Sequence, residues 1–366
     1  MEEIMDQKRV VVKIGSSSLT KTNGEIDFSK LRQHVSAIVH LKQRNYEVIL
    51  VSSGAVACGF KKMGYSQKPI TLKGRQAAAA VGQSLLIQAY TEALESDGYV
   101  AAQLLLTRQD FQNKTSYQNA QDTIEELLER NVLPIINEND TVSIKELTFG
   151  DNDQLSALVS GLVHAEQLII LTDINGLYDA NPNVEPSAKR FDHLDCITDE
   201  LLSFATSEGS KVGTGGMQSK LLAAKTAFEL GVNVFIGTGD SESKLLEILN
   251  GDGDGTYIAK ENPQQISSQK QWISLFSETN GSIYIDEGAE NAILNNGKSL
   301  LPAGVYLITG DFIEGDVVDI YRERRLIGKG EVRYNSDELK KCMGKRTDEI
   351  NNHTVVVHRD RFVSIT

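Results

Sequence analysis

The sequence predicts an α/β fold: a mainly parallel sheet sandwiched by helices, followed by a small β-rich domain. Between Arg9 and Gly237, short apolar runs alternate with segments of helical periodicity. Strands separated by helix-length segments imply a parallel sheet with both faces covered. After about Ala259 the helical segments give way to short β-like runs separated by turns, which indicates a second, β-rich domain.

The apolar runs of the first part predict six strands. The first ends at a glycine, and the others follow helix-length intervals. The expected strands are Arg9–Gly15, Glu47–Ser52, Val100–Leu106, Val132–Ile136, Leu168–Leu171 and Val232–Ile236. Ligands of such sheets bind outside the carboxyl ends of the strands, and the polar motifs of this chain follow those ends.

Helices are expected between the strands. The first starts with Ser29 as its N-cap, because Leu31, Val35, Ile38 and Leu41 then fall on one face. The expected helices are Ser29–Arg44, Ala77 to about Leu94, Asn119–Arg130, Asp153–Val163 and Gly216–Leu230.

The boundaries predict a domain over residues 1–260, a polar linker over 261–273 and a β-rich domain over 274–366. The β-like runs of the last part are Ser282–Ile285, Gly304–Ile308, Asp316–Tyr321, Leu326–Val332 and Thr354–His358.

Composition limits the classes of function. The chain has 366 residues, of which 40% are hydrophobic, so it can bury a substantial core. Its net charge of −13 argues against a general binder of nucleic acid or anionic membranes. No apolar run reaches the ~18 residues of a membrane span, and the first residues show no secretory signal. Three widely separated cysteines fit a reducing compartment, so we expect a cytoplasmic protein.

Lysines associated with glycine-rich segments are the first chemical signal. Lys13 ends a strand before Gly15 and three serines, a grouping that suits phosphate oxygens, although an ordinary strand-end lysine beside a turn fits equally well. Lys220 lies in the first turn of a helix entered through Thr214, Gly215, Gly216 and Met217. The free N–H groups of such a helix start favour anions, and a flexible glycine-rich loop is the alternative.

Polar residues after other strands are the second signal. Asn137 and Asp140 end one strand, and Asn152 and Asp153 open the next helix, so Asp140 and Asp153 are expected to face one cleft. The carboxamides and carboxylates of this stretch suit an ammonium group or Mg²⁺, and the alternative is two polar turns with an Asp that caps the helix.

Two further segments are weak signals when taken alone. Ser53 and Gly54 follow a strand, and small residues there let a ligand carboxylate approach backbone amides. Thr172 and Asp173 end another strand in a turn-rich segment. The six histidines show no metal spacing, so zinc chemistry is set aside and no metal ligand is assigned.

Together these residues favour phosphoryl transfer to an anion. Two lysines with aspartates between them suit catalysis by positioning and electrostatic stabilisation. A carboxylate acceptor, with a pKa near 4, needs no general base, which agrees with the absence of a candidate catalytic histidine.

The segments VVKIGSSSL, VSSGAVACG, INEND, FGDND, LTDINGLYDANP and VGTGGMQSK together resemble the amino-acid kinase family. Residues 9 to 238 carry the resemblance, which is closest to the members that phosphorylate the side-chain carboxylate of glutamate in proline biosynthesis. The tail, around SIYIDEGAENAI and GDFIEGDVVDI, is similar to a PUA domain.

The resemblance implies site residues and partners. Lys13, Lys220 and Asp153 would be catalytic, with Asp153 orienting the two lysines. Glutamate would be bound by Ser53, Gly54, Asn137, Asp140 and Asn152. ATP, carried with Mg²⁺, would be bound by Lys13, Gly15, Thr172, Asp173, Thr214, Gly215, Gly216, Met217 and Lys220. Proline is the expected feedback inhibitor, and a homo-oligomer, a dimer or tetramer, is the expected assembly.

Two alternatives remain. The first is another amino-acid kinase, with aspartate, acetylglutamate or carbamate as its acceptor. The second is an RNA-binding protein, because PUA domains also occur in RNA-modifying enzymes and residues 322–346 carry nine Lys/Arg against four Asp/Glu. Residues 274–366 as a whole, however, carry twelve Lys/Arg against fifteen Asp/Glu, so RNA binding is not expected.

Overall fold

The computed structural model describes residues 8–21, 23–142, 152–180, 182, 185–202, 216–239, 241–259, 267–350 and 355–365. The chain divides into two compact units. The first contains the residues up to Asp110 together with Thr115–Gln265, and the second contains Phe111–Lys114 together with Ile266–Thr366. Each unit has its own apolar core. None of the helices in these ranges is long and apolar enough to cross a membrane.

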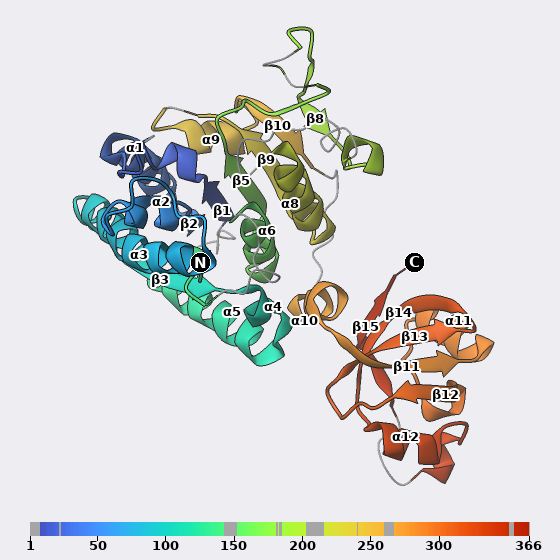
Figure 1. The fold of residues 1–366 in the computed structure, drawn as a ribbon. Helices are drawn as coiled ribbons and strands as arrows, with labels where there is room; N and C mark the ends of the chain where they lie inside the picture. The colour runs from blue at the N-terminus through green and yellow to red at the C-terminus, as the bar shows by residue number, and fades with distance from the viewer. Residues whose placement is uncertain are drawn as a thin grey trace, which may run out of the picture. The chain divides into compact units, whose positions relative to one another are not determined.

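A single large sheet organises the first unit (Figure 1). Within the described ranges its order is β3-β4-β2-β1-β5-β9-β10-β8. The strands are β1 (Arg9–Ile14), β2 (Glu47–Val51), β3 (Ala101–Leu106), β4 (Leu133–Glu138), β5 (Gln167–Leu171), β8 (His193–Leu194), β9 (Asn233–Gly237) and β10 (Gly255–Ile258). From β3 to β9 every pair is parallel, whereas β10 runs antiparallel to β9. The predicted mainly parallel sheet is confirmed.

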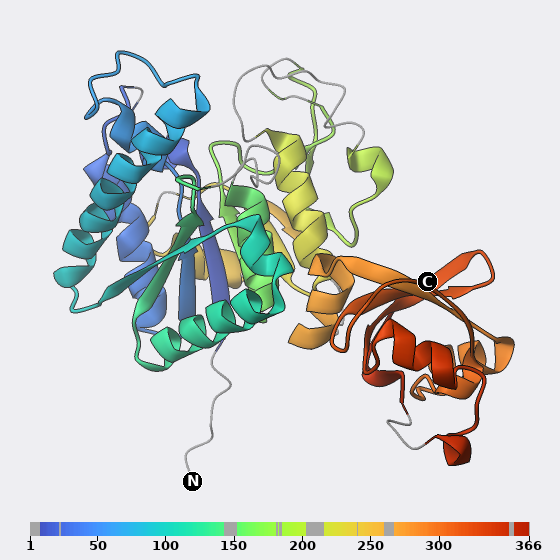
Figure 2. The same ribbon diagram turned by 60° about the horizontal axis from the view of Figure 1, so that its bottom comes forward.

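Helices cover both faces of this sheet. The helices described between residues 28 and 249 are α1 (Phe28–Lys42), α2 (Ala55–Phe60), α3 (Leu72–Glu95), α4 (Arg108–Gln112), α5 (Lys114–Glu129), α6 (Asn152–Leu162), α8 (Met217–Glu229) and α9 (Lys244–Leu249). Helices α1, α3 and α9 share one core with the strands. Helices α6 and α8 contact one another, and α6 contacts β1 and β5 (Figures 1 and 2).

Three helix starts differ from the sequence prediction, and one of them is α5, which begins at Lys114, five residues before the expected Asn119. Asp27, not Ser29, caps α1. Its carboxylate accepts a hydrogen bond from the Lys30 N–H at 3.3 Å, and its negative charge is stabilised by the positive end of the helix dipole. Helix α3 begins at Leu72, five residues before the expected Ala77, and the Thr71 hydroxyl caps it at Gly74 N–H, also at 3.3 Å.

Helix α2 lies in a segment for which no helix was expected, and close backbone contact with α3 holds it there. A Cβ atom on Gly59 would lie 1.9 Å from the Ala78 carbonyl oxygen, and one on Gly82 would lie 1.8 Å from the Ala55 carbonyl oxygen. Glycine at both positions therefore permits the two helices to touch backbone to backbone, which fixes the start of α2 beside β2.

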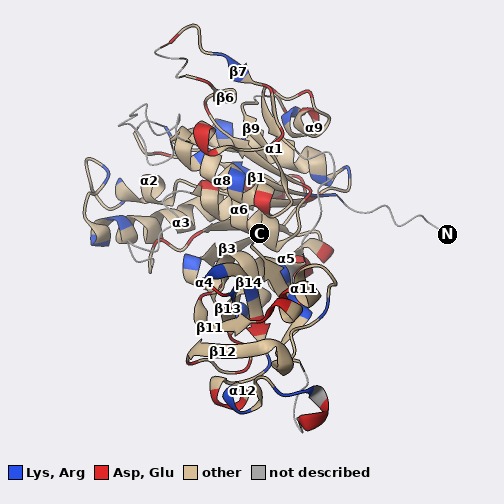
Figure 3. Ribbon diagram, turned by 90° about the vertical axis from the view of Figure 1, so that its right-hand side faces the viewer, with Lys and Arg blue, Asp and Glu red and all other residues tan. Residues whose placement is uncertain are grey.

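The second unit is β-rich, as predicted. Its sheet has the order β12-β11-β13-β14-β15, with β11 and β13 parallel and the other pairs antiparallel. The elements are α10 (Ser268–Gln271), β11 (Thr279–Ile285), α11 (Glu287–Leu294), β12 (Val305–Gly310), β13 (Val317–Arg322), β14 (Arg325–Val332), α12 (Ser336–Cys342) and β15 (Val357–Ser364). Basic and acidic residues are interspersed along them (Figure 3). Helix α12, for example, carries Asp337 and Glu338 in its first turn and Lys340 and Lys341 in its last.

Candidate active site

Strand β1 directs Lys13 to the face of the sheet that carries α6 and α8. Val10, Val12 and Ile14 belong to the core shared with α1 and α3. Since side chains alternate along a strand, Lys13 faces the opposite side. It is only 5% exposed, which requires a counter-charge.

Asp153 supplies that charge and joins Lys13 to Lys220. It lies in the first turn of α6 and is fully buried. One carboxylate oxygen, Oδ1, forms an ion pair with Lys13 Nζ, and the other, Oδ2, accepts a hydrogen bond from Lys220 Nζ at 3.1 Å. Lys220, in the first turn of α8, is 8% exposed. Three residues predicted as catalytic, from three separate elements, therefore meet at one point.

Electrostatics keeps Asp153 ionised. Burial favours its neutral form, but the positive charges of Lys13 and Lys220 and their hydrogen bonds outweigh burial and hold the pKa of Asp153 below its usual value. The cluster consequently carries two positive charges and one negative charge, and its excess positive charge suits a phosphate group.

A second buried cluster joins the residues predicted to bind the substrate. Asn152 Nδ2 donates to Asn137 Oδ1 at 2.6 Å and to Ser53 Oγ at 3.1 Å, and it also contacts the Ser52 carbonyl oxygen. Asn137 and Asn152 are 1% and 7% exposed. Because Asn152 and Asp153 are adjacent on α6, this amide cluster lies next to the lysine cluster.

The backbone at Gly54 is left-handed, with φ +101°, and α2 begins immediately afterwards. An L-residue with a side chain is strained at this φ, so glycine allows the sharp turn from β2 into α2. The turn places Ser53 beside the amide cluster, as the 3.1 Å bond from Asn152 shows.

Asp140 follows β4 and lies near two cations that the sequence did not single out, Lys68 and Arg75. Burial raises the pKa of Asp140, and the charges of Arg75 and Lys68 partly oppose that rise. Lys68 precedes α3 and Arg75 is in its first turn, 65 or more residues from Asp140 in the chain, so no local motif relates them.

The residues predicted to bind nucleotide are partly described. Thr172 and Asp173 follow β5; Thr172 N–H bonds to the Gly237 carbonyl oxygen at 2.9 Å, and its hydroxyl donates to Asp173 at 3.1 Å. Gly216 is the N-cap of α8 and Met217 its first residue. Gly15 precedes a short 3₁₀ turn, Ser16–Ser18. Thr214 and Gly215 lie outside the described residues.

No candidate metal site formed by protein side chains is found among the described residues. These residues contain no group of three or more His, Cys, Asp or Glu side chains that could hold a metal ion. Asp153 does not fit such a role, because each of its oxygens faces a lysine.

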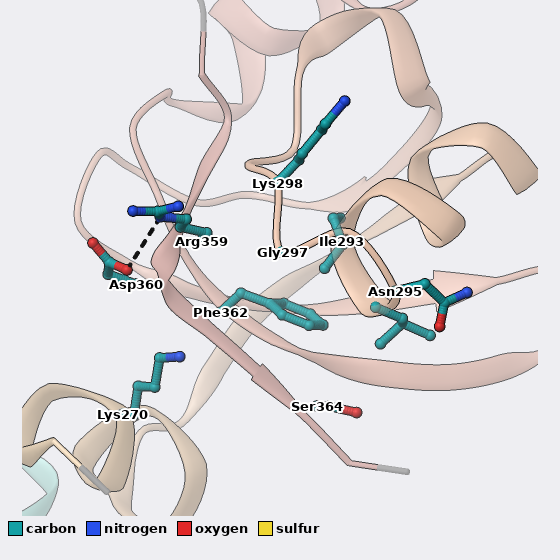
Figure 4. A pocket seen from close by; sticks show the side chains of 10 residues that line it. Lys270, Ile293, Asn295, Gly297, Lys298, Arg359, Asp360, Phe362 and Ser364 are labelled. Atoms are coloured by element: carbon teal, nitrogen blue, oxygen red, sulfur yellow. Dashed lines mark ion pairs between the residues drawn. The ribbon is translucent and has the colours of Figure 1, made fainter.

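A pocket of about 590 Å³ lies within the second unit and contains none of the predicted site residues (Figure 4). Phe362 and Ile293 give it an apolar lining, and Arg359 pairs with Asp360 at 3.6 Å on its rim.

Known proteins match both units. A model of the amino acid kinase family matches residues 8–238, and a model of the PUA domain matches residues 281–354. Glutamate 5-kinase 1 of Bacillus licheniformis is 58% identical over 363 residues, which cover 99% of this chain and 100% of that protein. Glutamate 5-kinase 1 of Bacillus subtilis is 56% identical with the same coverage. A solved carbamate kinase from Giardia lamblia bound to AMP-PNP covers 70% of this chain and 99% of its own, at 18% identity and a TM-score of 0.50, a likeness of fold alone.

Proposed function

The chain belongs to the amino-acid kinase family, and we propose that it is a glutamate 5-kinase, which transfers the γ-phosphoryl group of ATP to the side-chain carboxylate of L-glutamate. The product is glutamyl 5-phosphate, and the reaction opens proline biosynthesis. The observation that carries the proposal is the buried bridge of Asp153 between Lys13 and Lys220.

The bridge suits a reaction between two anions. The γ-carboxylate, with a pKa near 4, is ionised at neutral pH and attacks without a general base. Its repulsion from the phosphoryl group is the main obstacle. Lys13 and Lys220 place positive charge beside the transferring group, in a site where burial strengthens the attraction. Asp153 holds both ammonium groups in position before substrate arrives, so little reorganisation is required.

The amide cluster suits the amino-acid end of glutamate. Asp140 is the anion that pairs with the α-ammonium group, and Asn137, Asn152, Ser53 and the Gly54 backbone provide further hydrogen bonds to the amino-acid end. The adjacency of Asn152 and Asp153 on α6 supports a substrate that lies with its α-carbon at the amide cluster and its γ-carboxylate at the lysines.

ATP is proposed to lie toward the carboxyl ends of β5 and β9, with its phosphates near Gly15, Thr172, Asp173 and the start of α8. The segment Thr214–Lys220 contributes N–H groups and one ammonium. Mg²⁺ is proposed to accompany ATP through the nucleotide's own phosphates and water, where it neutralises charge. Feedback inhibition by proline, a homo-oligomeric assembly and a cytoplasmic location belong to the same proposal.

A hydroxylamine-trapping assay tests this function, since acyl phosphates form hydroxamates. The purified chain is incubated with ATP, Mg²⁺ and, separately, glutamate, aspartate, acetylglutamate or carbamate. Glutamate is expected to give the highest kcat/KM. If aspartate gives hydroxamate and glutamate gives none, the assignment is wrong. The same preparation, titrated with RNA at low salt, checks the expectation that the second unit does not bind RNA tightly.

A further inference from the structure

One face of α3 contacts the amide cluster through side chains that the proposed mechanism does not use. Gln83 and Tyr90 are seven residues apart, close to two full helical turns, and therefore share a face. Gln83 is 8% exposed and Tyr90 is fully buried. Gln83 Oε1 accepts a hydrogen bond from Asn137 Nδ2 at 2.7 Å, and the Tyr90 hydroxyl lies 3.0 Å from Ser52 Oγ.

A backbone donor decides which way the Asn137 amide points. An asparagine side chain has two donor hydrogens on nitrogen and one acceptor oxygen, so exchanging its ends exchanges donors for acceptors. The Glu138 N–H can only donate, at 2.9 Å, and it therefore requires the Asn137 oxygen, which also accepts from Asn152 Nδ2 at 2.6 Å. Asn137 Nδ2 consequently faces Gln83, whose Oε1 accepts it at 2.7 Å and holds the other end of the carboxamide.

The orientation passes on to Asn152. Because Asn137 presents an oxygen, Asn152 must present its nitrogen, which also serves Ser53 Oγ and the Ser52 carbonyl oxygen. Within the described part of the chain, Asn152 Oδ1 has no hydrogen-bond partner. That oxygen is thus available as an acceptor for an N–H group of a ligand.

We propose that Gln83 is a positioning residue for substrate binding: through Asn137 it fixes Asn152 with its oxygen available to accept from the α-ammonium group of glutamate. This inference rests on the proposed function. Gln83 does not touch the substrate. Without its acceptor, Asn137 Nδ2 loses its partner and the carboxamide is held at its oxygen end alone. The bond from Asn152 to that oxygen is then less well positioned, and with it the Asn152 oxygen that the ammonium group requires.

The test compares Gln83→Leu, which removes the acceptor at similar size, with Gln83→Glu, which keeps an acceptor oxygen there. Gln88→Leu is the matched control, because Gln88 lies on the same helix but is exposed and pairs with Glu92. Steady-state rates give the KM values for glutamate and ATP, and thermal unfolding checks that each variant is folded.

Gln83→Leu is expected to raise the glutamate KM about tenfold, as loss of one buried hydrogen bond implies, while the ATP KM stays unchanged. Gln83→Glu is expected to show a smaller increase, and Gln88→Leu none. In an Asn137→Ala background, Gln83→Leu is expected to add nothing, because its effect passes through Asn137.

Three results would overturn the proposal: an unchanged glutamate KM in Gln83→Leu, an equal rise in both KM values, or the full effect persisting without Asn137. The parent chain is assayed alongside. If it forms no glutamate hydroxamate, the proposed function fails and this inference fails with it. If the parent is active and Gln83→Leu behaves like the parent, only the inference fails.

Discussion

Replacing Asp153 by asparagine removes one negative charge and almost no volume. Lys13 and Lys220, 5% and 8% exposed, would then face one another without the anion that joins them. The asparagine oxygen can still accept a hydrogen bond from one lysine, but it cannot offset two positive charges.

The cost in stability follows from burial. Removing one partner of a buried ion pair typically costs about 3–5 kcal/mol, because the remaining charge stays buried without compensation. Asp153 is fully buried and serves two lysines, so Asp153→Asn is expected to lie at the upper end of that range. This is a large fraction of the roughly 5–15 kcal/mol by which a domain is stable.

Urea unfolding followed by far-ultraviolet circular dichroism measures this loss. Tryptophan fluorescence is less suitable, because Trp272, the chain's single tryptophan, lies in the second unit. Asp199→Asn is the control, since Asp199 also pairs with a lysine, Lys225, but is 93% exposed, and no measurable loss is expected. A decrease of less than about 1 kcal/mol in the free energy of unfolding of Asp153→Asn would refute the claim that the two buried lysines depend on Asp153 for charge compensation.

The pH dependence provides a second check with a definite sign. The pKa of Asp153 is lower in the folded chain than in the unfolded chain. Its stabilisation is therefore fully present above the unfolded value of about 4 and is lost as pH falls through the lower folded value. The difference in stability between the parent and Asp153→Asn should narrow below pH 4. A difference that stays constant or widens would contradict the assigned direction of the shift.

Two further predictions concern catalysis and binding. Lys220→Ala should lower kcat by about 10²–10³, the usual cost of removing one hydrogen-bond donor that stabilises the transition state, with little change in glutamate KM. A change confined to KM would assign the lysine to ground-state binding. Burial raises the pKa of Asp140, so its carboxylate begins to be protonated above pH 4 as the pH falls. Protonation removes the charge that pairs with the ammonium group, and the glutamate KM should therefore begin to rise above pH 4. Asp140→Asn should raise the glutamate KM and abolish that pH dependence, and an unchanged KM would remove Asp140 from the substrate site.

The strands and the lysine of β1 were predictable because their signals are local. A strand buried on both faces appears as a continuous apolar run, and a lysine inside Arg9–Ile14 departs from that pattern. The same holds for the start of α8, where a glycine-rich segment enters an amphipathic helix. Lys220 could therefore be selected before its partner was known.

The contacts of α3 were not predictable in this way. Gln83 and Asn137 are 54 residues apart, and nothing near either residue indicates that they meet. Lys68 and Arg75 are similarly remote from Asp140 and resemble ordinary surface charges in sequence. Helix α2 was missed because its short, small-residue sequence has no helical periodicity, and it is held by backbone contact at Gly59 and Gly82.

The positions of the charges explain why the fold suits this reaction. Lys13 is fixed by the pleat of β1, Asp153 by the start of α6 and Lys220 by the start of α8. None of the three can move far without disturbing an element packed in the core, so their charges are held in place before substrate binds. Both oxygens of Asp153 face lysines, which leaves it unsuited to act as a base, and a carboxylate acceptor needs none. An alcohol acceptor, with its far higher pKa, would require a proton acceptor that this cluster does not provide. We therefore propose that the cluster selects for an acceptor that is already ionised, and that the amide cluster beside it selects among such acceptors.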